Sequence, residues 1–112
     1  MEGWDRVSVD IEGLRRSVAE GERPLRITTH AQVEAFKEGL QLADLRHVFE
    51  IGAVIEEYGR ERALLYGWAV TVHLPVHLVI EEAPEEVVLI TAYIPDRSEW
   101  IGYSRRRKRR KA

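Results

Sequence analysis

The sequence contains no cysteine, which excludes a disulfide framework, a thiolate metal site and a cysteine nucleophile. It also has no apolar run near the ~20 residues that a membrane-spanning helix needs. Its first residues, MEGWDRVSVD, lack the basic and then apolar pattern of a signal peptide. We therefore expect a cytoplasmic protein that does not contact a membrane.

Motifs that hold cofactors or metals are missing as well. The sequence has no glycine-rich phosphate loop, no serine-nucleophile motif and no dinucleotide fingerprint. The histidines show no recognised zinc spacing; they are His30, His47, His73 and His77. We therefore expect neither a cofactor nor a bound metal.

Positive charge is scarce except at the C-terminal end. Seven of the 17 basic residues form one run, which leaves ten basic residues against 19 acidic ones in the rest of the chain. Because the charges of this run repel one another and it has nothing apolar to bury, we expect a single domain over residues 1–104 and a disordered basic tail over residues 105–112. The run consists of Arg105, Arg106, Arg107, Lys108, Arg109, Arg110 and Lys111.

The basic run is a candidate nucleic-acid-binding element, because clustered lysines and arginines attract the phosphates of RNA. An acidic protein partner would be attracted by the same charges. Two other interpretations stay open. The run is also typical of a solubilising tail, or of a segment that folds back on the acidic body of the chain.

Helical spacing of apolar residues is confined to the first half of the chain. Val33, Phe36 and Leu40 recur at this spacing and predict the core-facing stripe of the second helix. The three predicted helices span Ser8–Glu20, His30–Glu38 and Leu42–Ile51.

After Gly52 the spacing of apolar residues changes from the helical pattern to the alternation of extended strands. Runs rich in valine and isoleucine are separated there by short polar turns. The predicted fold is therefore α+β, with the N-terminal helices packed on one face of a four-stranded antiparallel meander. The four predicted strands span Ala53–Tyr58, Ala63–Val70, Leu74–Glu82 and Glu86–Ile94.

Several short motifs follow one another along the chain. They are Thr29-His30-Ala31, Gly52, Glu56 or Glu57 with Tyr58, Gly67-Trp68, Pro75-Val76-His77, Thr91-Ala92-Tyr93-Ile94-Pro95, and Trp100. In this order and spacing, over about residues 25–100, the sequence resembles the bacterial family called domain of unknown function 4258. It departs from the family at Glu34 and Glu38, where arginines are often found, and this removes positive charge from that helix.

In fold, this family is similar to the small bacterial toxins of the RelE and ParE type, which carry N-terminal helices on an antiparallel sheet. Several of those toxins cleave RNA, and others bind gyrase. The resemblance therefore implies a toxin-type domain that acts on RNA, with an antitoxin protein as a partner.

Three residues are candidates for acid–base chemistry. His77 points to one face of its predicted strand, and its neighbours Val76 and Leu78 point to the other face. Tyr93 of the next strand is expected within reach of His77. A histidine beside a tyrosine can transfer protons to and from a ribose hydroxyl or a phosphate. His30 stands at a helix N-terminus, where free backbone amides bind phosphate. Both histidines are more typical of structural residues, one hydrogen-bonded in the sheet and one at the start of a helix.

Two functions therefore remain open from the sequence. The first is a ribonuclease of the toxin type, with His77, Tyr93 and His30 as candidate catalytic residues and the basic run as the RNA-binding element. The second is a non-catalytic interaction module, in which an open sheet edge or an apolar groove binds a protein partner or a second copy of the chain.

We predict that the run from Arg105 to Lys111 supplies most of the non-specific affinity for nucleic acid. For single strands, the slope of log affinity against log salt is about −0.7 per phosphate neutralised, so full engagement of the run contributes roughly −5. RNA titrations at several salt concentrations, with the intact chain and with a chain ending at Ser104, measure this contribution. Equal affinity and equal slope for the two chains would rule the run out as the binding element.

Overall fold

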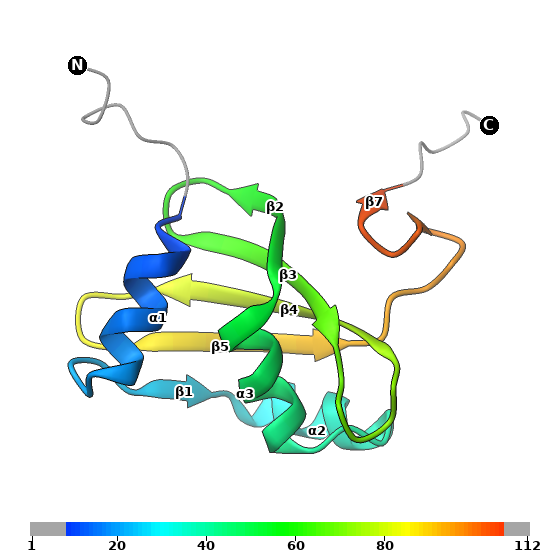
Figure 1. The fold of residues 1–112 in the computed structure, drawn as a ribbon, viewed down its shortest axis with the longest axis horizontal. Helices are drawn as coiled ribbons and strands as arrows, with labels where there is room; N and C mark the ends of the chain where they lie inside the picture. The colour runs from blue at the N-terminus through cyan, green and yellow to red at the C-terminus, as the bar shows by residue number, and fades with distance from the viewer. Residues whose placement is uncertain (1–8, 107–112) are drawn as a thin grey trace.

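The computed structural model describes residues 9–106, which form an α+β fold with three helices and a five-stranded mixed sheet (Figure 1). The α+β class is confirmed, as are the bounds predicted for the third helix and the first strand of the meander. None of the helices within residues 9–106 is both long and apolar enough to cross a membrane. The helices are α1 (Ile11–Ala19), α2 (Thr29–Lys37) and α3 (Leu42–Ile51). The strands are β1 (Leu25–Ile27), β2 (Ala53–Tyr58), β3 (Arg62–Trp68), β4 (Pro75–Glu82), β5 (Val87–Tyr93), β6 (Trp100–Ile101) and β7 (Arg105–Arg106).

The sheet differs from the predicted one at one edge. Its strand order is β1-β5-β4-β3-β2, and the strands from β2 to β5 pair antiparallel with their neighbours in sequence. β1 pairs in parallel with β5, so that Leu25 lies opposite Val87. The prediction of a purely antiparallel, four-stranded sheet is therefore wrong. A segment of three residues after Pro24 is too short to show strand alternation, and its sequence indicates only an extended chain.

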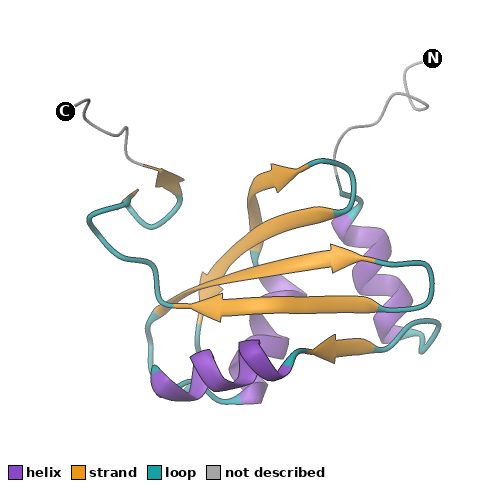
Figure 2. Ribbon diagram, turned by 180° about the vertical axis from the view of Figure 1, so that it is seen from behind, coloured by secondary structure: helices purple, strands orange, loops and turns teal. Residues whose placement is uncertain are grey.

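α1 and α3 cover one face of the sheet. They lie in front of the strands in Figure 1 and behind them in Figure 2, where the molecule is seen from the other side. The core lies between these helices and the sheet face that points toward them. Its fully buried side chains include Leu45, Val48, Leu65, Val76, Leu78 and Ile80.

The predicted core stripe of α2 is wrong at two of its three positions. Val33 and Phe36 are 45% and 57% exposed, whereas Leu40, which follows the helix, is buried. α2 instead places Ala31 and Ala35 in the core, and both are 0% exposed. Small alanine side chains let α2 approach β5 closely, so the larger apolar side chains of the same helix are left at the surface.

The turn from α3 into β2 depends on a close backbone contact at Gly52. A Cβ atom at this position would lie 2.6 Å from the carbonyl oxygen of Val48 and 3.0 Å from that of Tyr66. Both distances are shorter than ordinary van der Waals contact, so only glycine fits without a shift of the backbone. The Arg15 side chain of α1 donates to the carbonyl oxygens of Phe49 (2.7 Å) and Gly52 (2.5 Å) at the same junction. α1 and α3 are thereby held together where β2 begins.

A buried carboxylate joins α3 to the loop between β3 and β4. Asp44 is 1% exposed and accepts hydrogen bonds from the backbone amides of Gln41 (2.9 Å) and Thr71 (3.1 Å) and from the Thr71 hydroxyl (2.6 Å). Burial raises the pKa of Asp44, but the hydrogen bonds to its carboxylate outweigh burial, and the net shift of this pKa is downward. Because this loop leads into β4, the contact helps to fix the start of the strand that carries His77.

Asp44→Asn should lower the free energy of unfolding by about 1–3 kcal/mol, because the amide nitrogen of asparagine would face N–H or O–H donors whose hydrogen bonds the carboxylate now accepts. The folded-state pKa of Asp44 lies below its unfolded value. Its contribution to stability is therefore present above the unfolded pKa and is lost as the pH falls through the folded pKa. Denaturant unfolding of both proteins from neutral to acidic pH measures the loss and its pH dependence.

Asp96→Asn is the matched control. The exposed Asp96 carboxylate accepts a hydrogen bond of 2.9 Å from the backbone amide of Ser98, which asparagine can also accept. This variant should stay within about 0.5 kcal/mol of wild type. An equal loss of stability in the two variants would contradict the role assigned to Asp44.

Candidate functional site

The sheet face opposite α1 and α3 carries a row of aromatic and polar side chains. Tyr66 of β3 lies opposite His77 of β4, and His77 lies opposite Tyr93 of β5. Directly paired residues of antiparallel strands share a face, so the three rings are neighbours across the sheet. The ring centroids of His77 and Tyr93 are 5.3 Å apart, and those of His77 and Tyr66 are 5.9 Å apart.

A bulge in β2 adds Glu56 to this face. Val54 pairs with Leu65 and Glu56 pairs with Leu64, so one extra residue of β2 stands between the two pairs. In a regular strand Val54 and Glu56 would share a face, but the extra residue turns Glu56 away from the core that Val54 contacts. Tyr58 donates a hydrogen bond of 2.7 Å to Oε1 of Glu56. Together these side chains form the outer-face cluster, which consists of Glu56, Tyr58, Tyr66, His77 and Tyr93.

A C-terminal hairpin, formed by β6 and β7, covers the middle of the outer-face cluster. The Trp100 ring meets the His77 ring edge-on with centroids 4.5 Å apart, and the Tyr103 carbonyl oxygen lies 2.5 Å from Nε2 of His77. Positive φ angles at Gly102 (60°) and Tyr103 (69°) reverse the chain between the two strands. As a result His77 is 0% exposed and Trp100 is 2% exposed.

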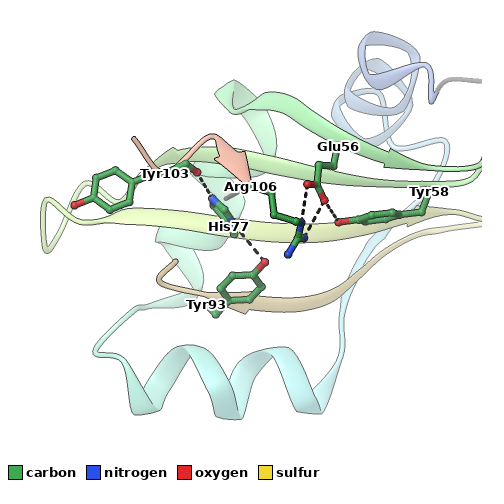
Figure 3. Close-up of polar contacts among 6 residues, drawn as sticks. All are labelled: Glu56, Tyr58, His77, Tyr93, Tyr103 and Arg106. Carbon is green, nitrogen blue, oxygen red and sulfur yellow. Dashed lines mark hydrogen bonds and ion pairs between the residues drawn. The ribbon is translucent and has the colours of Figure 1, made fainter. Parts of the chain in front are cut away.

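Arg106 joins this hairpin to β2 (Figure 3). Its Nε and Nη2 atoms each lie 3.0 Å from an oxygen of Glu56, and its guanidinium carbon lies 4.5 Å from the centroid of the Trp100 ring. The side chains of Arg106 and Glu56 are 50% and 24% exposed. An ion pair this open to solvent typically stabilises a structure by no more than ~1 kcal/mol, so the contact can be exchanged at low cost.

The hydrogen bonds of His77 determine its protonation state. A carbonyl oxygen only accepts, so Nε2 carries the proton that it donates to Tyr103. Nδ1 of the neutral ring is then the acceptor, and it lies 3.3 Å from the Tyr93 hydroxyl. Burial lowers the pKa of His77, and the hydrogen bond to Tyr103 only partly opposes this shift. His77 is therefore a neutral imidazole with both nitrogens in use while the hairpin covers it.

The other ionisable groups of the cluster have shifted pKa values as well. The hydrogen bonds from Arg106 lower the pKa of Glu56, which is therefore a carboxylate at neutral pH. Burial of the phenol, helped by the hydrogen bond to Glu56, raises the pKa of Tyr58 to about 12. Burial also raises the pKa of Tyr93. Both tyrosines thus keep their protons at neutral pH.

The structure brings together two of the three predicted acid–base residues, His77 and Tyr93. The third, His30, is exposed on α2, and within residues 9–106 no hydrogen bond or ring contact joins it to the outer-face cluster. In the same part of the chain no group of three or more His, Asp or Glu side chains lies together as metal ligands do.

Of the residues predicted to bind nucleic acid, Arg105 and Arg106 form β7, and both are exposed. The others lie outside the described residues; they are Arg107, Lys108, Arg109, Arg110 and Lys111.

Sequence reasoning missed the contact between Arg106 and Glu56. The two residues are 50 positions apart, and a uniform basic run gives no sign that one of its arginines has a fixed partner. The signal that was present is the charge imbalance, because an acidic body favours a basic end that folds back on it. Arg106 makes a contact of this kind.

The buried neutral His77 predicts a pH-dependent stability. Its ordinary pKa is 6.5 and its folded-state pKa is lower, so its contribution to stability is present above pH 6.5 and is lost as the pH falls toward the folded pKa. The loss reaches about 1.4 kcal/mol per pH unit at most. In His77→Gln this part of the pH dependence should disappear, because glutamine can donate to Tyr103 and accept from Tyr93 without titrating. Denaturant unfolding from neutral pH to about pH 5 measures the difference.

His73→Asn provides the control, since His73 is an exposed histidine at a positive φ of 52°, a conformation that asparagine tolerates. This variant should keep the wild-type pH dependence. If His77→Gln also keeps it, His77 is not the residue responsible.

A family profile with the description Domain of unknown function (DUF4258) matches residues 27–94, which is more than half of the chain. The matched segment contains α2, α3 and the strands from β2 to β5, and it includes His77 and Tyr93. It ends before the β6–β7 hairpin. No curated protein and no solved structure matches the chain. The chain therefore belongs to the DUF4258 family, as its motifs predict.

Proposed function

We propose that this protein is a small domain of the RelE and ParE toxin type that binds RNA through its basic C-terminal end and cleaves it at the outer-face cluster. The observation that carries the proposal is the position of Arg106. The basic run begins on the sheet face that holds His77 and Tyr93, and the Arg106 guanidinium lies over Trp100, whose ring contacts His77. An RNA strand held by this run would lie beside the two candidate acid–base residues.

The chemistry of the cluster suits cleavage by the neighbouring ribose hydroxyl. Once the Tyr93 hydroxyl has turned from Nδ1 of His77 toward the leaving oxygen, Nδ1 of the neutral ring accepts the proton of a 2′-hydroxyl, and the 2′-oxygen forms a bond to the adjacent phosphorus. The bond from phosphorus to the 5′-oxygen breaks, and Tyr93 donates a proton to that leaving oxygen. The hydrogen bond between Nδ1 and the Tyr93 hydroxyl then lets the proton pass from His77 to Tyr93. The products are a cyclic phosphate and a 5′-hydroxyl, and both residues regain their starting states.

This mechanism requires the hairpin to move. While β6 and β7 cover the site, His77 is 0% exposed and donates Nε2–H to Tyr103, so a ribose cannot reach it. The structure therefore corresponds to a closed state under this proposal, and an antitoxin protein that stabilises the hairpin would keep it closed.

The second candidate is a non-catalytic interaction module, and the burial of His77 favours it. A histidine with no exposed surface and two hydrogen-bonded nitrogens is also what a purely structural residue looks like. A module of this kind would bind a protein partner or a second copy through other surfaces. α2 offers one, because Val33 and Phe36 are exposed.

Induced expression in bacteria, with growth and RNA integrity followed together, tests the proposed function. The wild-type chain should slow growth and cleave RNA. His77→Ala should reduce cleavage by about 10²–10⁴-fold, the usual contribution of a general acid or base, and Tyr93→Phe should reduce it less. Thermal unfolding of each variant must first resemble that of wild type, since His77 also contributes to packing.

His73→Asn serves again as the control and should cleave at the wild-type rate. If a folded His77→Ala chain also cleaves at that rate, the assignment of His77 as the base is wrong. A wild-type chain that neither slows growth nor cleaves RNA, but self-associates or retains a protein partner, would establish the interaction module instead.

A further inference from the structure

The contact between Arg106 and Glu56 has the geometry of a phosphate site. A guanidinium presents two parallel N–H groups, which fit the two oxygens of a carboxylate or of a phosphodiester equally well. In this structure those groups are held 3.0 Å from the two oxygens of Glu56. Glu56 is itself fixed in place by the hydrogen bond from Tyr58 (2.7 Å). A carboxylate therefore occupies the position on Arg106 that a phosphodiester would take.

We propose that Glu56 is an internal competitor for phosphate at Arg106, and that RNA displaces it and thereby releases the β6–β7 hairpin from His77. This inference rests on the proposed function, because it assigns the first RNA contact and the event that uncovers the site.

Arg106 links phosphate binding to the hairpin through two direct contacts. It is paired with Trp100 across the hairpin, and its guanidinium stacks on the Trp100 ring. Trp100 in turn covers His77 with ring centroids 4.5 Å apart. When Arg106 leaves Glu56, the hairpin loses its ion pair with β2, and Trp100 loses the cation that stacks on it. The hairpin then still contacts the sheet through the hydrogen bond from His77 to the Tyr103 carbonyl, the packing of Trp100 on His77, and the edge-on contact between the rings of Trp68 and Tyr103 (6.3 Å).

Three features favour exchange over a permanent contact. The pair is open to solvent, since the Arg106 side chain is 50% exposed, so a phosphate can reach the guanidinium before Glu56 has left. Arg106 is also followed in the sequence by five further basic residues, whose charges attract a polyanion such as RNA to the neighbourhood of Arg106. In residues 9–106, β6 and β7 pair with each other in a sheet of their own, so the hairpin can move away from β4 without breaking any strand pairing.

The chain contains a matched control pair on the same face of the sheet. Arg62 of β3 lies opposite Glu81 of β4, and the two side chains form an ion pair that does not involve the hairpin. The Arg62 and Glu81 side chains are 49% and 35% exposed, which is close to the exposure of Arg106 and Glu56. Glu81→Gln therefore removes the same charge from the same face without releasing Arg106.

The experiment measures how fast diethylpyrocarbonate modifies His77 in the full chain, with mass spectrometry to separate it from the exposed His30 and His73. Glu56→Gln and Arg106→Ala should both increase the rate at His77 by about two- to fivefold, because each breaks the ion pair that holds the hairpin. Glu81→Gln should leave the rate at the wild-type value. A wild-type rate in Glu56→Gln, or an equal increase in Glu81→Gln, would overturn the proposal.

Binding of a 2′-O-methyl oligoribonucleotide, which has no nucleophilic hydroxyl, separates competition from catalysis. Glu56→Gln should bind it more tightly than wild type, and Arg106→Ala should bind it less tightly, although both variants uncover His77. The oligonucleotide should also increase His77 modification in the wild-type chain, and inorganic phosphate at the same phosphate concentration should do so far less.

The outcomes distinguish this inference from the proposed function. If the oligonucleotide binds but leaves His77 protected, the exchange is wrong while RNA binding stands. If inorganic phosphate uncovers His77 as well as the oligonucleotide does, the ligand of Arg106 is free phosphate and the assignment to RNA is wrong. If the wild-type chain does not bind the oligonucleotide, both the inference and the proposed function fail.

Discussion

A buried imidazole needs a partner for each ring nitrogen, and in this protein that need joins the C-terminal hairpin to the sheet. His77 finds one partner within the sheet, the Tyr93 hydroxyl of the neighbouring strand. The other is the Tyr103 carbonyl, which becomes available only after the chain has turned back over β4. The same turn places Trp100 over the ring and Arg106 beside Glu56. The arrangement of the outer face therefore follows from the requirement that a desolvated polar ring be fully paired.

The two faces of the sheet are held by different forces, so they should open at different free energies. The face toward α1 and α3 is closed by fully buried apolar side chains, and it opens only with the whole fold. The outer face is closed by a short hairpin, one ion pair with Glu56 and the contacts around His77. A protein with this division can uncover a polar site without exposing its core. Such local opening suits a surface that must be closed in one state and accessible in another.

The change of period at Gly52 was enough to predict the α+β class and the strands from β2 to β5, because alternation over several residues is a strong signal. The same alternation placed His77 and Tyr93 on neighbouring strands but left their register open, and the structure shows that they pair directly. The core side of α2 was not predictable, since close packing through Ala31 and Ala35 prevailed over the larger Val33 and Phe36. β1 and the hairpin strands are too short for any periodic signal. β1 pairs with a strand about 60 residues away, and the hairpin is held on the sheet by contacts with the distant residues Glu56 and His77.

The parallel pairing of β1 with β5 has a consequence for the order in which the chain acquires its structure. The hydrogen bond from the Thr28 hydroxyl to the Ile90 carbonyl joins residues 62 positions apart, and α2 packs on the same strand. Contacts of such long sequence separation close a large loop and form slowly. During synthesis β1 and α2 leave the ribosome well before β5, so Ala31 and Ala35 of α2 and the pairing edge of β1 stay uncovered until the C-terminal half has been made. β1 and α2 therefore acquire their packing only when the chain is nearly complete, and until then they expose apolar surface and an unpaired strand edge.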